Sequence, residues 1–179
     1  MLTKKEIRAK MLKKRGKMTK EQVKTLSKII EEKLLSLKEI QNKQNFFIYN
    51  SFKNEVETSG IISALKKSGK TVSCPLVNGE TMLAVVPTSN DYFEDKFGVK
   101  TPKNYALAQN IEVAIIPLVA CDKRKNRIGF GKGYYDKFLN DKTILKIGVC
   151  YNYQVVEKVE NSAFDVPLDI IITETQIIK

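Results

Sequence analysis

Residues 127–136 read RIGFGKGYYD and carry three alternating glycines, Gly129, Gly131 and Gly133. The string follows an apolar run at residues 113–120 and precedes a segment with a helical pattern. Because glycine lacks a Cβ atom, this backbone can turn sharply and direct several amide N–H groups at one anion. In an open α/β sheet, a loop between a strand and a helix start is where a phosphate meets such groups. The order strand, glycine loop and helix therefore predicts a phosphate site.

Charged residues strengthen this prediction. Arg124, Lys125, Arg127 and Lys132 place positive charge around the loop, and Asp136 supplies an oxygen ligand that suits Mg²⁺. Together they predict a site for a nucleotide polyphosphate. The glycines alone would leave open a loop that only turns the chain, because G-x-G-x-G is neither the Rossmann fingerprint nor a Walker loop.

Apolar segments elsewhere alternate between strand and helix patterns. This alternation predicts an α/β fold in which residues 1–179 form a single domain. Its sheet is expected to be open, mostly parallel and Rossmann-like, with helices on both faces. Strands are expected at residues 46–49, 71–74, 80–87, 113–119, 145–151 and 170–172, and helices near residues 4–14, 19–37 and 58–67 and ending near 139.

Two capping boxes mark the start of the N-terminal helices. Thr3 and Glu6 have the spacing of a capping box, in which each side chain accepts a hydrogen bond from the free backbone N–H group of the other residue. A second such box begins at Thr19. Lys4 and Arg8 lie four residues apart and therefore share one face of the first helix. From this pattern alone they could be ordinary surface charges.

Composition excludes several classes of function. Histidine is absent, which removes every mechanism that needs an imidazole base, nucleophile or metal ligand. The three cysteines, Cys74, Cys121 and Cys150, show neither a disulfide framework nor the spacing of a zinc site. No apolar run is long enough to span a bilayer, and no secretory signal is recognisable. We therefore expect a cytoplasmic protein that does not bind membranes.

The formal net charge is +11, and most of the excess lies in the first 45 residues. A basic amphipathic segment of this kind could bind nucleic acid. Because no nucleic-acid motif or exposed aromatic ladder accompanies the charge, a solvated helix face is the favoured interpretation. The same charge would also attract a substrate that carries phosphates and carboxylates.

The string at 127–136, preceded by Ile116-Pro117-Leu118-Val119 and Asp122, resembles the 5-formyltetrahydrofolate cyclo-ligase family, also called methenyltetrahydrofolate synthetase. Supporting segments occur in the same order as in the family. They are Lys4 with Arg8, residues 55–58, Gly69-Lys70, Pro75, and Asp165 with Asp169. The resemblance implies a sheet similar to the sugar-phosphate isomerase and CoA-transferase type.

The resemblance also implies roles for individual residues. Lys4 and Arg8 would reach the ATP phosphates, Arg127 and Lys132 would be catalytic, and Asp136 and Asp165 would hold Mg²⁺. The full set assigned to ATP is Lys4, Arg8, Arg127, Gly129, Phe130, Gly131, Lys132, Gly133, Tyr134 and Tyr135. The set assigned to the folate is Phe52, Glu57, Lys132, Gly133 and Tyr134. On local pattern alone, Glu57 and Asp136 could instead be acids that stabilise helix N-termini.

The implied reaction is the ATP- and Mg²⁺-dependent cyclisation of 5-formyltetrahydrofolate to 5,10-methenyltetrahydrofolate, with release of ADP and phosphate. It would proceed by phosphorylation of the formyl oxygen. The expected partners are these small molecules alone, without nucleic acid, and the expected state is a monomer. Two alternatives stay open, namely a basic RNA-binding module and a non-ligase enzyme for sugar phosphates or CoA on a related fold.

Overall fold

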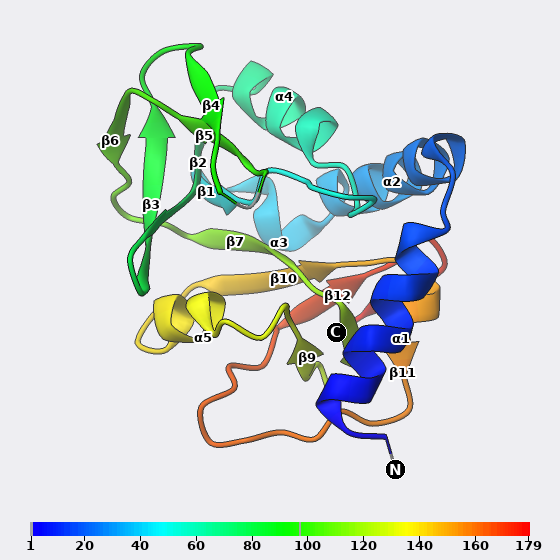
Figure 1. The fold of residues 1–179 in the computed structure, drawn as a ribbon. Coiled ribbons are helices and arrows are strands. Elements are labelled where there is room, and N and C mark those ends of the chain that lie inside the picture. The colour runs from blue at the N-terminus through cyan, green and yellow to red at the C-terminus, as the bar shows by residue number, and fades with distance from the viewer. Residues whose placement is uncertain (1, 97) are drawn as a thin grey trace.

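A computed structural model describes residues 2–96 and 98–179. Its main sheet has eight strands in the order β13-β12-β10-β7-β1-β2-β3-β6 (Figure 1). Pairing is parallel from β12 to β2, and the outer strands β3, β6 and β13 pair antiparallel. This confirms the predicted open, mostly parallel sheet. The strand bounds are β1 Asn45–Ile48, β2 Thr71–Asn78, β3 Thr81–Pro87, β6 Tyr105–Leu107, β7 Val113–Pro117, β10 Leu145–Val149, β12 Ile170–Ile172 and β13 Ile177–Ile178.

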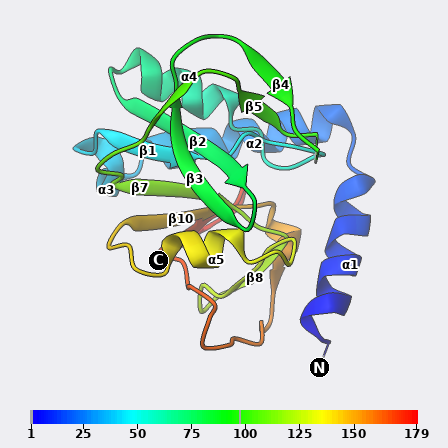
Figure 2. The same cartoon turned by 60° about the vertical axis from the view of Figure 1, so that its left-hand side comes forward.

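Helices cover both faces of this sheet, as predicted. The helices α2 (Lys20–Leu35), α3 (Lys38–Gln41) and α4 (Ser59–Lys67) lie on one face, and α5 (Tyr134–Leu139) lies on the other (Figures 1 and 2). Each face of the sheet packs into its own hydrophobic core, and alternate residues of β1 belong to different cores. Phe46 and Ile48 lie in the core on one face, whereas Phe47 lies in the core on the other. Side chains of a strand alternate between faces, so a strand covered on both sides is apolar throughout.

The order in which strands are added to the sheet reverses between β1 and β7. From β1 it passes through α4 to β2 on one side, whereas β7 lies on the other side of β1 and leads to β10 and β12. Ligands bind at the carboxyl ends of the strands beside such a switch point. The segments that leave β1 and β7 at this edge are residues 49–58 and 118–133.

The segment after β7 builds a small second sheet. Strand β8 (Ala120–Asp122) lies between β9 (Arg127–Ile128) and β11 (Val155–Val156). Helix α1 (Lys4–Gly16) packs on it through Ile7 and Met11. The sequence did not predict this sheet, which places the N-terminal helix directly beside the glycine loop (Figure 1).

The remaining elements are short. The strands β4 (Tyr92–Glu94) and β5 (Lys100–Pro102) form a separate pair, and η1 (Asn152–Gln154) is a 3₁₀ turn. Both predicted capping boxes are confirmed, at Thr3 and Thr19. Among residues 2–96 and 98–179, no helix has the combination of length and apolar character that a bilayer span requires.

Candidate active site

The glycine loop joins β9 to α5 and adopts backbone conformations that favour glycine. Gly131 has a φ of +100° and Gly133, the N-cap of α5, has a φ of +70°. Side chains with a Cβ rarely adopt such values. Helix α5 has only six residues, so its dipole would contribute little to an anion site at this loop, which would depend instead on the amide groups and the surrounding cations.

A turn built on Asp122 positions the start of the loop. The fully buried carboxylate of Asp122 accepts hydrogen bonds from the backbone N–H groups of Arg124 (3.0 Å), Asn126 (3.0 Å) and Val159 (2.9 Å). The turn carries Arg124 and Lys125, two of the predicted cations. It returns the chain into β9, where Arg127 begins the glycine string.

Helix α1 brings two predicted phosphate cations to the loop. The Nε–H of Arg8 donates to the carbonyl oxygen of Gly129 at 2.8 Å. A Cβ atom on Gly131 would lie 3.3 Å from the Arg8 Cζ atom, so the guanidinium rests directly on the loop backbone. Lys4, one turn earlier on the same face, donates to the Oδ2 atom of Asp165. The structure thus brings together residues more than 120 positions apart in the sequence.

The two carboxylates predicted to hold Mg²⁺ lie in this cluster. The Oδ1 atom of Asp136 accepts hydrogen bonds from Arg127 (2.7 Å) and from the backbone N–H of Val166 (3.1 Å). This second hydrogen bond places the backbone that directly follows Asp165 against the Asp136 carboxylate. Burial would raise the pKa of Asp165, but hydrogen bonds from Lys4 and Ser162 outweigh it and lower that pKa below its usual value.

The cluster fits a metal bound jointly by protein and nucleotide. No group of three or more carboxylate, cysteine or histidine side chains capable of holding a metal exists in the described parts of the chain. Mg²⁺ usually takes one or two carboxylates and completes its octahedron with phosphate oxygens and water. Arg127 is 7% exposed, and its Nε–H has no hydrogen-bond partner within the described residues. An anionic ligand could satisfy this donor.

The other predicted loop residues are divided between surface and interior. Phe130, Gly131 and Lys132 are exposed. The Tyr134 hydroxyl donates to the carbonyl oxygen of Gly79 at 3.2 Å, which ties the start of α5 to the β2–β3 hairpin. Tyr135 points inward against Phe47, with ring centroids 6.2 Å apart, and burial raises its pKa.

Of the two glutamates in the segment predicted to bind folate, the buried one is Glu55 and not the predicted Glu57. The Glu57 side chain is exposed, and its backbone N–H donates to the Ser27 hydroxyl at 2.9 Å. Glu55, two residues earlier, is only 7% exposed. Its Oε2 atom accepts a hydrogen bond from the backbone N–H of Phe52 at 3.0 Å. The predicted aromatic residue Phe52 is half-buried.

Glu55 has a perturbed ionisation. Burial raises its pKa to about 7, against the opposing effects of the Arg15 charge and the Phe52 N–H group. The Arg15 Nη2 atom lies 3.8 Å from the Glu55 Oε1 atom. The sequence did not single out either residue. Arg15 could have been found, because it lies seven residues after Arg8 and so on the same helix face.

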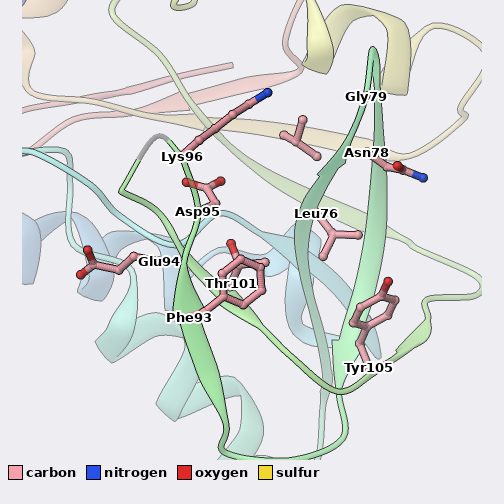
Figure 3. Close-up of a pocket in the computed structure, with 10 residues that line it drawn as sticks. Leu76, Asn78, Gly79, Phe93, Glu94, Asp95, Lys96, Thr101 and Tyr105 are labelled. Carbon is pink, nitrogen blue, oxygen red and sulfur yellow. The ribbon is translucent and has the colours of Figure 1, made fainter.

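A cavity of about 420 Å³ lies between the β2–β3 hairpin and the β4–β5 pair (Figure 3). Leu76 and Tyr105 line it from the main sheet, and Phe93 and Thr101 face them from the smaller pair. Gly79, which accepts the hydrogen bond from Tyr134, also lines it. The Tyr134 hydrogen bond therefore joins the start of α5 to the tip of the hairpin that lines this cavity.

Comparison with known proteins connects this geometry to one family. A family model described as the 5-formyltetrahydrofolate cyclo-ligase family matches residues 1–174. The chain is 34% identical over 175 residues to a 5-formyltetrahydrofolate cyclo-ligase of Mycoplasma genitalium, covering 96% of this chain and 98% of the relative. A 5-formyltetrahydrofolate cyclo-ligase of Haemophilus influenzae is 30% identical over 175 residues, with coverage of 91% and 93%.

Two solved structures similar to this chain carry the synthetase name of the same family. The 5,10-methenyltetrahydrofolate synthetase of Aquifex aeolicus superposes with a TM-score of 0.87 and 31% identity, covering 98% of this chain and 92% of that one. The corresponding synthetase of Mycoplasma pneumoniae gives a TM-score of 0.78 and 28% identity, with coverage of 97% and 99%.

Proposed function

The chain belongs to the 5-formyltetrahydrofolate cyclo-ligase family, and on this premise we propose which of its residues carry out the family's reaction. The reaction is the ATP-dependent cyclisation of 5-formyltetrahydrofolate to 5,10-methenyltetrahydrofolate. The formyl oxygen attacks the γ-phosphorus as the bond to ADP breaks. N10 then attacks the activated carbon and loses its proton, and inorganic phosphate leaves.

The ATP phosphates are proposed to lie on the glycine loop, between α1 and the two acids. Lys4, Arg8, Arg127 and Lys132 supply positive charge where negative charge spreads during phosphoryl transfer. The observation that carries this proposal is the contact of Arg8 with Gly129 and its packing against Gly131. The protein needs no covalent nucleophile, since its task is to align the formyl oxygen with the phosphate.

We propose that Asp136 and Asp165 hold Mg²⁺ when the nucleotide is bound. A bound Mg²⁺ would neutralise phosphate charge during the transfer. Each acid now pairs with a predicted phosphate cation, Asp136 with Arg127 and Asp165 with Lys4. Nucleotide binding would exchange these partners, so that the cations turn to the phosphates and the acids to the metal.

For the folate we propose Glu55, rather than Glu57, as the carboxylate that contacts the pterin ring. A buried carboxylate can accept two adjacent N–H groups, such as those of an aminopyrimidinone edge, where competing water is excluded. Glu55 has this burial and lies at the switch point, whereas the side chain of Glu57 faces solvent. Phe52, which precedes Glu55 in the same loop, would supply part of the apolar wall.

The reaction is tested by near-ultraviolet absorbance of the protein with 5-formyltetrahydrofolate and Mg-ATP. Growth of the methenyl band only when ATP and metal are both present is the expected result. A flat trace from folded protein would contradict the proposal. Salt-sensitive oligonucleotide binding would then favour an RNA-binding module, and phosphate-ester binding without ATP consumption would favour a non-ligase enzyme.

We also propose that the protein acts as a cytoplasmic, single-domain monomer. The proposed nucleotide site is assembled by contacts within one chain, and three free, buried cysteines fit a reducing compartment. Sedimentation at micromolar concentration should give the mass of one 20.4 kDa chain. A dimer mass would contradict the proposed monomer.

A further inference from the structure

Arg15 lies where the two halves of the proposed site meet. It shares the face of α1 that carries Lys4 and Arg8 and is 4% exposed. One side of its guanidinium approaches the carboxylate of Glu55 at 3.8 Å. Its Cζ atom also lies 5.2 Å from the centroid of the Phe130 ring in the glycine loop. Arg15 therefore contacts both the proposed nucleotide loop and the proposed folate carboxylate.

We propose that Arg15 is a positioning residue for folate binding, which holds the Glu55 carboxylate ionised and in place while it supports Phe130. This inference rests on the proposed contact of Glu55 with the folate. It assigns to Arg15 no contact with either substrate. Arg15 would instead act through the two side chains that it touches.

The surroundings of Glu55 make Arg15 decisive for its charge. The titratable groups that interact with Glu55 from the packed elements are Arg15 on α1 and the tyrosines Tyr49, Tyr135 and Tyr151. Burial raises the pKa of all three tyrosines, so they are neutral near pH 7. Arg15 is thus the positive charge that opposes the effect of burial on Glu55. The backbone N–H of Phe52 adds a smaller effect in the same direction.

Removal of Arg15 should therefore shift the pH dependence of folate binding to higher pH. A cation within about 4–6 Å typically lowers the pKa of a carboxyl group by one unit or more. If the pKa of Glu55 rises by about one unit from about 7, its ionised fraction at pH 7 falls about fivefold. At pH 9 the carboxyl group is ionised in both proteins, so the difference should disappear.

The test compares Arg15→Met with the wild type by the KM for 5-formyltetrahydrofolate between pH 6 and 9. Methionine keeps an unbranched apolar side chain against Phe130 and removes the charge. Lys14→Met removes the same charge from an exposed neighbour that lies 4.5 Å from the Tyr153 ring centroid. We expect a KM about fivefold higher at pH 7 and close to wild type at pH 9 for Arg15→Met only. Arg15→Lys keeps the positive charge, so its KM at pH 7 should stay close to that of the wild type.

An unchanged pH profile in Arg15→Met, or a KM raised equally at pH 7 and pH 9, would overturn the proposal. A second measurement needs no ligand: the titration of Glu55, followed by ¹³C NMR of labelled carboxyl carbons, should move to higher pH in Arg15→Met. An unmoved titration would also overturn it. Wild-type KM values for Glu55→Gln at every pH would instead reject the folate contact of Glu55, and with it the positioning role. The NMR titration separates the two failures. If the Glu55 titration moves in Arg15→Met while Glu55→Gln keeps wild-type KM values, the ion pair exists but Glu55 does not contact the folate.

Discussion

Replacement of Glu55 by Gln should change how the stability of the protein depends on pH. Burial raises the pKa of Glu55 to about 7 in the folded protein, whereas 4.5 is its ordinary value. Between these two values the folded state binds more protons than the unfolded state, so the free energy of unfolding falls as the pH rises. A difference of about 2.5 units at 1.36 kcal/mol each corresponds to about 3 kcal/mol.

The prediction concerns the change with pH, because the variant also has a constant offset. Gln keeps an oxygen that can accept the hydrogen bond from Phe52, but it leaves the buried charge of Arg15 without its partner. That penalty is the same at every pH. The stability of Glu55→Gln relative to wild type should therefore rise by about 3 kcal/mol between pH 4.5 and 8.

The assay is urea unfolding followed by circular dichroism at pH values from 4.5 to 8. Glu57→Gln is the matched control, because its side chain is exposed two residues further along the same loop. Its stability relative to wild type should stay within about 0.5 kcal/mol over this range. A pH-independent difference between Glu55→Gln and wild type would refute the raised pKa of Glu55.

Two further predictions concern the nucleotide end. Gly131→Ala should weaken ATP binding more than Gly133→Ala, because both add backbone strain of about 1–2 kcal/mol but only at position 131 would the new Cβ meet the Arg8 guanidinium, at 3.3 Å. Calorimetric titration with Mg-ATP measures this difference, and equal losses would argue against the contact. Asp136→Asn should raise the Mg²⁺ concentration for half-maximal turnover about tenfold or more, whereas Asp141→Asn, exposed beyond α5, should stay near wild type. Equal Mg²⁺ requirements would exclude Asp136 as a ligand.

Local chemistry made much of the fold predictable. The side chains of Thr3 and Thr19 satisfy helix N–H groups within their own turn, so both helix starts were visible in the sequence. The apolar run at 113–119 predicted a strand covered on both faces, which the structure confirms as Val113–Pro117. The helix expected at 19–37 ends at Leu35, and a separate short helix, α3, begins at Lys38.

The environment of individual side chains was harder to predict, because it depends on contacts between distant segments. Glu55 and Glu57 lie in one short acidic stretch, and only the packing of α1 and the tyrosines around the first makes it the buried one. The ion pairs of Lys4 with Asp165 and Arg127 with Asp136 also needed the fold. The small sheet that seats α1 beside the glycine loop comprises strands of only two or three residues, too short to give a recognisable pattern.

The affinity of Arg8→Met for Mg-ATP, compared with that of Lys10→Met, tests the proposed phosphate site most directly. Both variants remove one positive charge from α1, but Arg8 rests on the glycine loop, whereas Lys10 is exposed to solvent. Loss of a charge-assisted hydrogen bond of about 1.5–3 kcal/mol should raise the Kd of Arg8→Met about 10- to 100-fold. The Kd of Lys10→Met should change less than about twofold, because an exposed charge is screened. Equal changes in the two variants, or none in either, would contradict a phosphate site between α1 and the glycine loop.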